Sequence, residues 1–193
     1  MKKLIFAGAF IALMNIQATL DLNPTISKVD LGKSKVSWIG KKVTGQHSGN
    51  ISLKSANLEF GKAGLTGGSF EMNMGTITCT DMQGEYADKL VGHLKSEDFF
   101  STEKFPVASF KITKATPTAK AGTYKVDGNL TIKGITKPVN FDAMVENGTA
   151  KAKIIIDRTQ FDIKYGSGSF FDNLGDKAID NNFILEVELA YTK

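Results

Sequence analysis

The chain has 193 residues, of which 41% are hydrophobic and 23% charged, a composition typical of one globular domain rather than a disordered or fibrous protein. One cysteine and two histidines rule out a disulfide scaffold and a CxxC-type zinc site, and they leave little for any other metal site, so no metal is expected. The net charge is +4, but the lysines alternate with acids and Arg158 is the only arginine, which argues against nucleic-acid binding.

Residues 1–18 have the features of a secretory signal peptide. A basic start precedes an apolar run from Leu4 to Met14, and the small residue Ala18 follows a short polar stretch. The run is shorter than the roughly 20 residues that span a bilayer, and it lacks the amphipathic pattern of a core helix. We therefore expect cleavage after Ala18, a periplasmic protein, and a single domain over residues 19–193.

Short segments in which every second residue is apolar follow one another along the chain. This period of two is typical of strands that are buried on one face, and glycine-rich turns separate the segments. Eight or nine strands of this kind predict an antiparallel β-sandwich or β-barrel. The alternating segments from which these eight or nine strands are expected are Val36–Trp38, Ile51–Leu53, Leu58–Phe60, Phe70–Met74, Ala108–Ile112, Tyr124–Ile132, Val139–Val145, Ala150–Ile156, Phe161–Tyr165 and Phe183–Tyr191.

One segment has a helical period instead. Between Glu85 and Lys95, the apolar residues Tyr86, Leu90 and Leu94 are spaced four residues apart, which places them on one face of a helix. A single short helix in an all-β chain is expected to cover or flank the mouth of a barrel.

The strongest local prediction is a β-hairpin that turns at Asn147-Gly148. This dipeptide favours a type I′ turn, because both of its central positions need a positive φ. Placing it in the turn makes the apolar and polar residues fall on opposite faces of the two strands. The predicted inward pairs are Val145–Ala150, Ala143–Ala152, Phe141–Ile154 and Val139–Ile156, and the outward pairs are Glu146–Thr149, Met144–Lys151 and Asp142–Lys153.

Three segments in the expected order resemble the YceI-like family. His93–Phe100, followed by Phe105-Pro106 and Phe110, is similar to the family pattern H-L-x-S-x-D-F-F…(Y/F)-P…F. Gly128–Val139 is similar to G-x-L-T-I-x-G-x-T-x-P-V, and Arg158–Phe161 to R-x-x-F. The resemblance covers about residues 28–192.

The resemblance implies a lipocalin-like antiparallel β-barrel of about eight strands with the short helix near its mouth. It also implies an exported, non-enzymatic protein that binds a polyisoprenoid or another long apolar lipid inside the barrel, for transport, storage or sequestration. No cofactor is expected besides a bound isoprenoid or fatty-acyl lipid. A homodimer is compatible with the resemblance, although no residue pattern predicts it.

The candidate ligand contacts are apolar residues expected to face the barrel interior. Phenylalanines dominate this set, and the methionines add flexible, polarisable surface that adapts to an irregular chain. The alternative is a filled core, since a barrel of this size either packs itself with side chains or holds one slender ligand. The candidates are Trp38, Phe70, Met72, Met74, Phe99, Phe100, Phe110, Phe141, Ile154 and Phe161.

Two charged or titratable residues are candidates for contacts at the barrel mouth. The planar guanidinium of Arg158 suits a carboxylate or phosphate headgroup, which a lysine cannot bind in the same bidentate way. We favour instead a structural role, in which Arg158 bridges to Asp157, Asp162 or Asp98 and fastens the helix over the barrel end. His93 is likewise expected to be a structural histidine that is hydrogen-bonded to a neighbour, with a headgroup contact as the alternative.

Two further functions stay open on the sequence. The first is a small enzyme on a lipocalin-like barrel with His47 or His93 as acid–base, although no catalytic motif is present and Cys79 with His93 forms no familiar catalytic context. Cys79 is expected to be a small buried hydrophobe rather than half of an intermolecular disulfide. The second is a membrane-inserted barrel, which the charged outer face of the predicted hairpin argues against.

Overall fold

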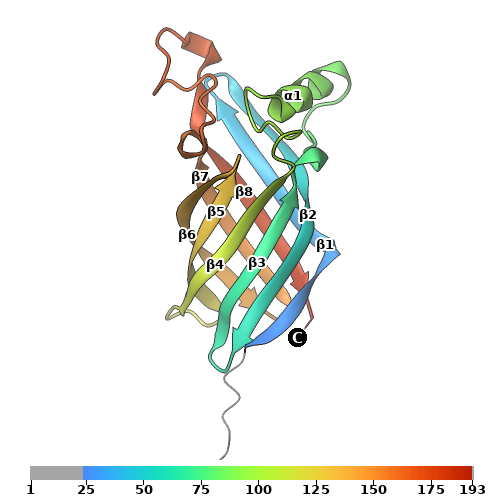
Figure 1. Cartoon of the computed structure of the whole chain (residues 1–193), viewed down its shortest axis with the longest axis vertical. Coiled ribbons are helices and arrows are strands. Elements are labelled where there is room, and N and C mark those ends of the chain that lie inside the picture. Colours follow the sequence, from blue (N-terminus) through green and yellow to red (C-terminus); the bar gives the residue numbers. More distant parts are fainter. Residues whose placement is uncertain (1–23, 193) are drawn as a thin grey trace, which may run out of the picture.

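A computed structural model describes residues 24–192 as an antiparallel β-barrel, closed in chain order by eight strands. The strands are β1 (Thr25–Lys42), β2 (Gly45–Gly61), β3 (Gly64–Asn73), β4 (Val107–Pro117), β5 (Thr123–Ile132), β6 (Ile135–Glu146), β7 (Thr149–Asp157) and β8 (Ile179–Tyr191). Figure 1 shows the barrel upright, with helix α1 (Glu85–Lys95) above one end. The predicted barrel with one short helix near its mouth is confirmed, whereas the predicted signal peptide, residues 1–18, lies outside the described residues.

The two ends of the barrel differ in how the strands are connected. At the lower end of Figure 1, short turns join β2 to β3, β4 to β5 and β6 to β7. The upper end carries two long connections, residues 74–106 and 158–178, which we call the cap. They contain α1 and the 3-10 helices η1 (Met74–Thr76), η2 (Arg158–Phe161) and η3 (Gly175–Lys177). None of the helices within residues 24–192 has both the length and the apolar character required to cross a membrane.

The β6–β7 hairpin has the predicted turn but a shorter ladder than expected. Asn147 and Gly148 both have positive φ, and the four pairs from Glu146–Thr149 to Ala143–Ala152 are formed as predicted. The predicted pairs Phe141–Ile154, Val139–Ile156 and Asp142–Lys153 are wrong. Beyond Ala152, β7 follows β8 and β6 follows β5, so the two strands diverge. The ammonium of Lys153 accordingly pairs with the carboxylate of Glu186 on β8, at 3.3 Å.

Other element boundaries also depend on neighbours that the local pattern does not contain. The short strands predicted around Val36, Ile51 and Leu58 are parts of the long strands β1 and β2. The predicted strand over Phe161–Tyr165 is wrong, because the chain enters η2 there. The carboxylate of Asp157 starts that turn by accepting hydrogen bonds from the backbone N–H and hydroxyl of Thr159, at 2.9 and 2.6 Å.

Helix α1 is formed where predicted, but its apolar stripe is only partly buried. Leu94 is buried against the barrel mouth, whereas Tyr86 is 76% exposed. The helix therefore contacts the barrel through its C-terminal half, and the turn after Ser96 carries Phe99 and Phe100 back over the opening.

A glycine in β5 makes room for a cluster of three phenylalanine rings in the interior. A Cβ atom on Gly128 would lie 2.3 Å from the ring of Phe110, so only glycine lets that ring lie across the strand. Phe110 stacks on Phe70 with ring centres 6.1 Å apart and meets the Phe141 ring at 5.5 Å. These rings form the wall of the cavity described next.

Candidate ligand-binding cavity

The lower half of the barrel contains an apolar cavity. It leaves about 90 Å³ in which the centre of a water-sized sphere can move. Inward side chains of the strands line it, and Lys151 is the one charged residue among those that do. The predicted site residues found here are Phe70, Met72, Phe110, Phe141 and Ile154.

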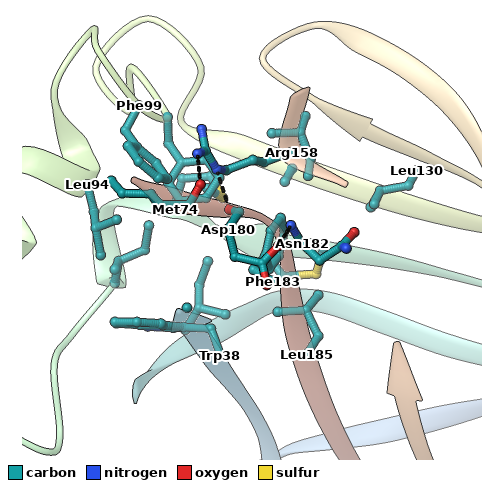
Figure 2. A pocket seen from close by; sticks show the side chains of 18 of the residues that line it. Trp38, Met74, Leu94, Phe99, Leu130, Arg158, Asp180, Asn182, Phe183 and Leu185 are labelled. Atoms are coloured by element: carbon teal, nitrogen blue, oxygen red, sulfur yellow. Dashed lines mark hydrogen bonds between the residues drawn. The ribbon is translucent and has the colours of Figure 1, made fainter. Parts of the chain in front are cut away.

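A second cavity, of about 100 Å³ by the same measure, lies between the upper half of the barrel and the cap. In Figure 2, Arg158 and Phe99 lie on one side of it and Trp38 on the other. The indole N–H of Trp38 donates to the carbonyl of Thr78 at 3.1 Å, which fixes the ring between barrel and cap. The predicted site residues found here are Trp38, Met72, Met74, Phe99, Phe100 and Arg158.

The two cavities meet at three shared residues. Met72, Leu130 and Leu185 line both of them, so these three side chains form the boundary at which the upper and lower cavities adjoin. The lining of the upper cavity includes Arg158, Asp180 and Asn182, but the surface that the cavity exposes is apolar. The interior is therefore mostly packed side chains, with two apolar cavities between them.

Arg158 is buried among backbone carbonyls rather than paired with an acid. Only 2% of the residue is exposed. Its Nε donates to the carbonyl of Asp180 at 3.0 Å, Nη1 to that of Ile163 at 2.7 Å and Nη2 to that of Ile179 at 3.0 Å. Burial lowers the pKa of the guanidinium, and the nearby carboxylates of Asp157 and Asp180 oppose that shift.

The predicted bridge from Arg158 to an acid is therefore wrong. Arg158 still connects the cap to the barrel end, but it does so through backbone carbonyls. The three carbonyls belong to the segment after η2 and to the start of β8, so Arg158 ties the cap to the barrel wall. Its guanidinium also lies 5.5 Å from the ring centre of Phe99, which carries the segment after α1. Figure 2 shows this arrangement at the upper end of the cavity.

His93 and Phe161 are among the predicted site residues, but neither lines a cavity. His93 lies between the rings of Phe99 and Tyr165, with centres 5.7 and 4.4 Å away, and its buried Nε2 has no hydrogen-bond partner. The expected hydrogen bond from His93 to a neighbour is thus absent at that nitrogen. Phe161 is 1% exposed and belongs to the packed core under the cap.

Several lining residues were not predicted as site residues. Leu130, Phe183 and Leu185 occupy inward positions of predicted strands, so the alternating pattern could have identified them. Ile77 and Asn182 carried no such signal. Ile77 follows η1 outside any strand, and Asn182 is a polar residue whose position depends on how β8 begins.

His47, Cys79 and Asp81 form a polar cluster that holds the segment before α1 against β2. The carboxylate of Asp81 contacts His47 Nδ1 at 2.8 Å and accepts from the Ser48 N–H at 2.8 Å and from Cys79 Sγ at 3.3 Å. Cys79 is half-buried and hydrogen-bonded to Asp81. It is therefore neither the fully buried hydrophobe expected from the sequence nor a partner of His93. His47 lines neither cavity.

This cluster lowers the pKa of the Asp81 carboxyl group. Burial by itself would raise its pKa, but the hydrogen bonds from Ser48, His47 and Cys79 outweigh burial and lower the pKa from 3.8 to about 2. Because the pKa is lower in the folded protein, ionised Asp81 stabilises the fold above about pH 4, and this contribution is lost as the pH falls through about 2.

We expect Asp81→Asn to lower the free energy of unfolding at pH 7 by about 1 kcal/mol, a value reduced by the partial exposure of the site. Denaturant unfolding at a series of pH values should show the difference from the unchanged protein shrinking between pH 4 and 2. Asp142→Asn, on the outer face of β6, is the control and should change little. A difference that is constant down to pH 2 would contradict the assignment.

Solved structures with the same fold support this architecture. The structure of Burkholderia cenocepacia BcnA superposes with a TM-score of 0.69 at 24% identity, covering 86% of this chain and 99% of that one. A polyisoprenoid binding domain from Saccharophagus degradans, implicated in plant cell wall breakdown, gives 0.59 at 11% identity, covering 87% and 98%. At these identities the likeness establishes the shared fold.

Relatives found by sequence point to one family. A UPF0312 protein of Photorhabdus laumondii is 34% identical over 117 residues, which are 58% of this chain and 59% of the relative. Protein YceI of Escherichia coli O157:H7 is 35% identical over 68 residues, 35% of this chain and 34% of the relative. The matches thus span less than two thirds of these relatives. The family model described as YceI-like domain matches residues 27–191, and the chain therefore belongs to the YceI-like family.

Proposed function

We propose that the protein binds the hydrocarbon chain of a long lipid, a polyisoprenoid or a fatty-acyl compound, inside the barrel. The observation that carries this proposal is the pair of adjoining apolar cavities, which would become one path for a hydrocarbon chain where Met72, Leu130 and Leu185 meet. Such a path removes a flexible chain from water, and each buried methylene contributes about 0.8 kcal/mol. The role is transport, storage or sequestration of the lipid.

The polar end of the lipid is proposed to lie in the upper cavity. Arg158 has no acid within salt-bridge distance among the described residues, so its charge is balanced mainly by carbonyl dipoles. Asp180 and Asn182 belong to the lining of the same cavity, beside the buried guanidinium. A neutral hydroxyl headgroup would suit this end better than an anion, because of the Asp180 carboxylate, while the chain extends toward the rings of Phe70, Phe110 and Phe141.

One comparison and one structural observation support a binding role over catalysis. The Saccharophagus degradans domain that shares the fold is a polyisoprenoid binding domain. Both histidines considered as acid–base groups lie outside the cavity walls, where no ligand in either cavity would meet them. The proposed export to the periplasm rests on the signal-peptide pattern of residues 1–18.

Native mass spectrometry of the protein purified from its own cells tests the binding role. We expect an added mass that organic extraction removes and that fragments as a long-chain lipid. The same spectrum counts protomers and so tests the homodimer. Repeated recovery of lipid-free protein, together with failure to bind isoprenoid and fatty-acyl probes, would overturn the proposal.

The N-terminal residue of protein from a periplasmic extract tests export and is expected to be Thr19.

A further inference from the structure

The seam between β6 and β7 has the shortest ladder of the described barrel, with four pairs. One other ladder also stops without resuming: β3–β4 ends at Gly68–Ile112, close to the lower end of the barrel. The pairing ends at Ala143–Ala152, although β6 continues up to Ile135 and β7 to Asp157. The interrupted ladders of β1–β2, β1–β8, β2–β3 and β4–β5 all continue beyond their interruptions. The wall therefore has a gap above Ala143 and Ala152.

The unpaired parts of β6 and β7 border this gap, and we call them its two lips. Both have the character of sheet edges. Backbone groups of a strand point alternately to its two neighbours, so half of those in the unpaired parts of β6 and β7 face the gap. Pro138 lies in this part of β6. Proline has no N–H to donate, and sheets tolerate it mainly at their edges. On the opposite lip, Ile155 is 66% exposed, so a cross-linking reagent can reach this position from solvent.

The interior cavity approaches the outside beside this seam. An outer groove of about 540 Å³ crosses the barrel surface and is lined by Asp142 and Lys153, the first residues above the last pair. Four residues line both this groove and the lower cavity: Ala143, Lys151, Ala152 and Val187. The small side chains of the last pair thus leave only a thin wall between the apolar interior and solvent.

Both ends of the barrel are closed more firmly than the seam. Buried side chains fill the lower end, among them Leu58, Leu65 and Tyr124. Opening the upper end would break the hydrogen bonds of Arg158 to three carbonyls and the contact of Trp38 with the cap. Widening the seam breaks no ladder pair, because none is formed above Ala143–Ala152.

We propose that the β6–β7 seam is a lateral gate through which a single hydrocarbon chain passes between solvent and the lower cavity. The inference rests on the proposed function, since a gate needs a lipid to admit. A chain one methylene wide can slide between Phe141 and Ile154, which line the lower cavity on the two sides of the gap. The charged residues of the outer groove would face the headgroup as it passes.

Joining the two lips chemically tests the gate. The variant Asn140→Cys with Ile155→Cys, made in a Cys79→Ser background, is linked by a short bismaleimide after its interior has been emptied by extraction. Association and dissociation of cis-parinaric acid, a fatty-acyl probe that fluoresces when bound, are followed by stopped flow. We expect both rates to fall at least tenfold, with the equilibrium Kd changed less than twofold.

Two linked controls separate the seam from the rest of the barrel. Lys111→Cys with Asn129→Cys joins neighbouring residues of the continuous β4–β5 ladder, and Ser48→Cys with Thr80→Cys joins the cap to β2. Neither should change the rates. Unchanged rates in the seam-linked protein, or slowing by the cap link instead, would overturn the gate while leaving the binding function intact. If neither the variants nor the unchanged protein binds the probe, the proposed function is wrong, and the gate proposal fails with it.

Discussion

Arg158→Met is expected to lower the free energy of unfolding by about 3 kcal/mol, because buried carbonyls lose their donor and each such loss costs about 1–3 kcal/mol. Methionine keeps much of the length of the side chain but donates no hydrogen bond. The carbonyls of Ile163, Ile179 and Asp180 would then remain inside a closed cap without that partner. The segments that these carbonyls belong to should open more often than the rest of the barrel.

Denaturant unfolding and amide hydrogen exchange measure the two effects. Arg158→Lys should recover only part of the loss, since one ammonium cannot replace a planar group that serves three acceptors. Lys164→Met is the matched control, because its ion pair with Asp162 is exposed to solvent and should contribute little to the free energy of unfolding. An Arg158→Met protein as stable as the unchanged one would show that the cap is held by its apolar contacts alone.

Met72→Trp is expected to weaken the binding of a long chain such as geranylgeraniol by at least about 100-fold. Met72 is 9% exposed and lines both cavities, so a bulkier side chain there would block the proposed path between them. Losing contact with four methylenes costs about 3 kcal/mol, which corresponds to about 100-fold in Kd. A short chain such as octanol needs only one cavity and should bind nearly as before.

Titration of the two ligands by fluorescence competition checks this dependence on chain length. Met144→Trp is the matched control, because Met144 lines the outer groove and does not line either interior cavity. If Met72→Trp fails to fold, Leu130→Phe tests the same constriction with a smaller change in volume. Equal losses for the long and short chains would contradict a path shared by the two cavities.

The hairpin at Asn147-Gly148 shows where sequence reasoning succeeds and where it ends. The turn type, the register and the inward face follow from local chemistry, and the four pairs nearest the turn are formed. The pairs farther away depend on whether each strand follows its hairpin partner or its other neighbour. Closing the barrel decides this in favour of β5 and β8, and no residue of the hairpin encodes that outcome.

The candidate site divides in a similar way. Nine of the ten apolar residues predicted to face the interior line one cavity or both. Phe161 is the exception, because the strand predicted there is a 3-10 turn that the buried guanidinium of Arg158 and the cap of Asp157 stabilise. The sequence marked Arg158 as unusual but suggested acids as its partners, since backbone carbonyls have no signature in a sequence.

The sequence by itself determined the all-β class, the approximate strand number, the helix over Glu85–Lys95 and the apolar character of the interior. These features depend on periodicity and turn chemistry, which act over a few residues. Only the tertiary structure decided that the interior holds two adjoining cavities, that carbonyls surround Arg158, and that the β6–β7 ladder ends early. Each of these depends on how distant strands tilt and close around a shared volume, which no local pattern specifies.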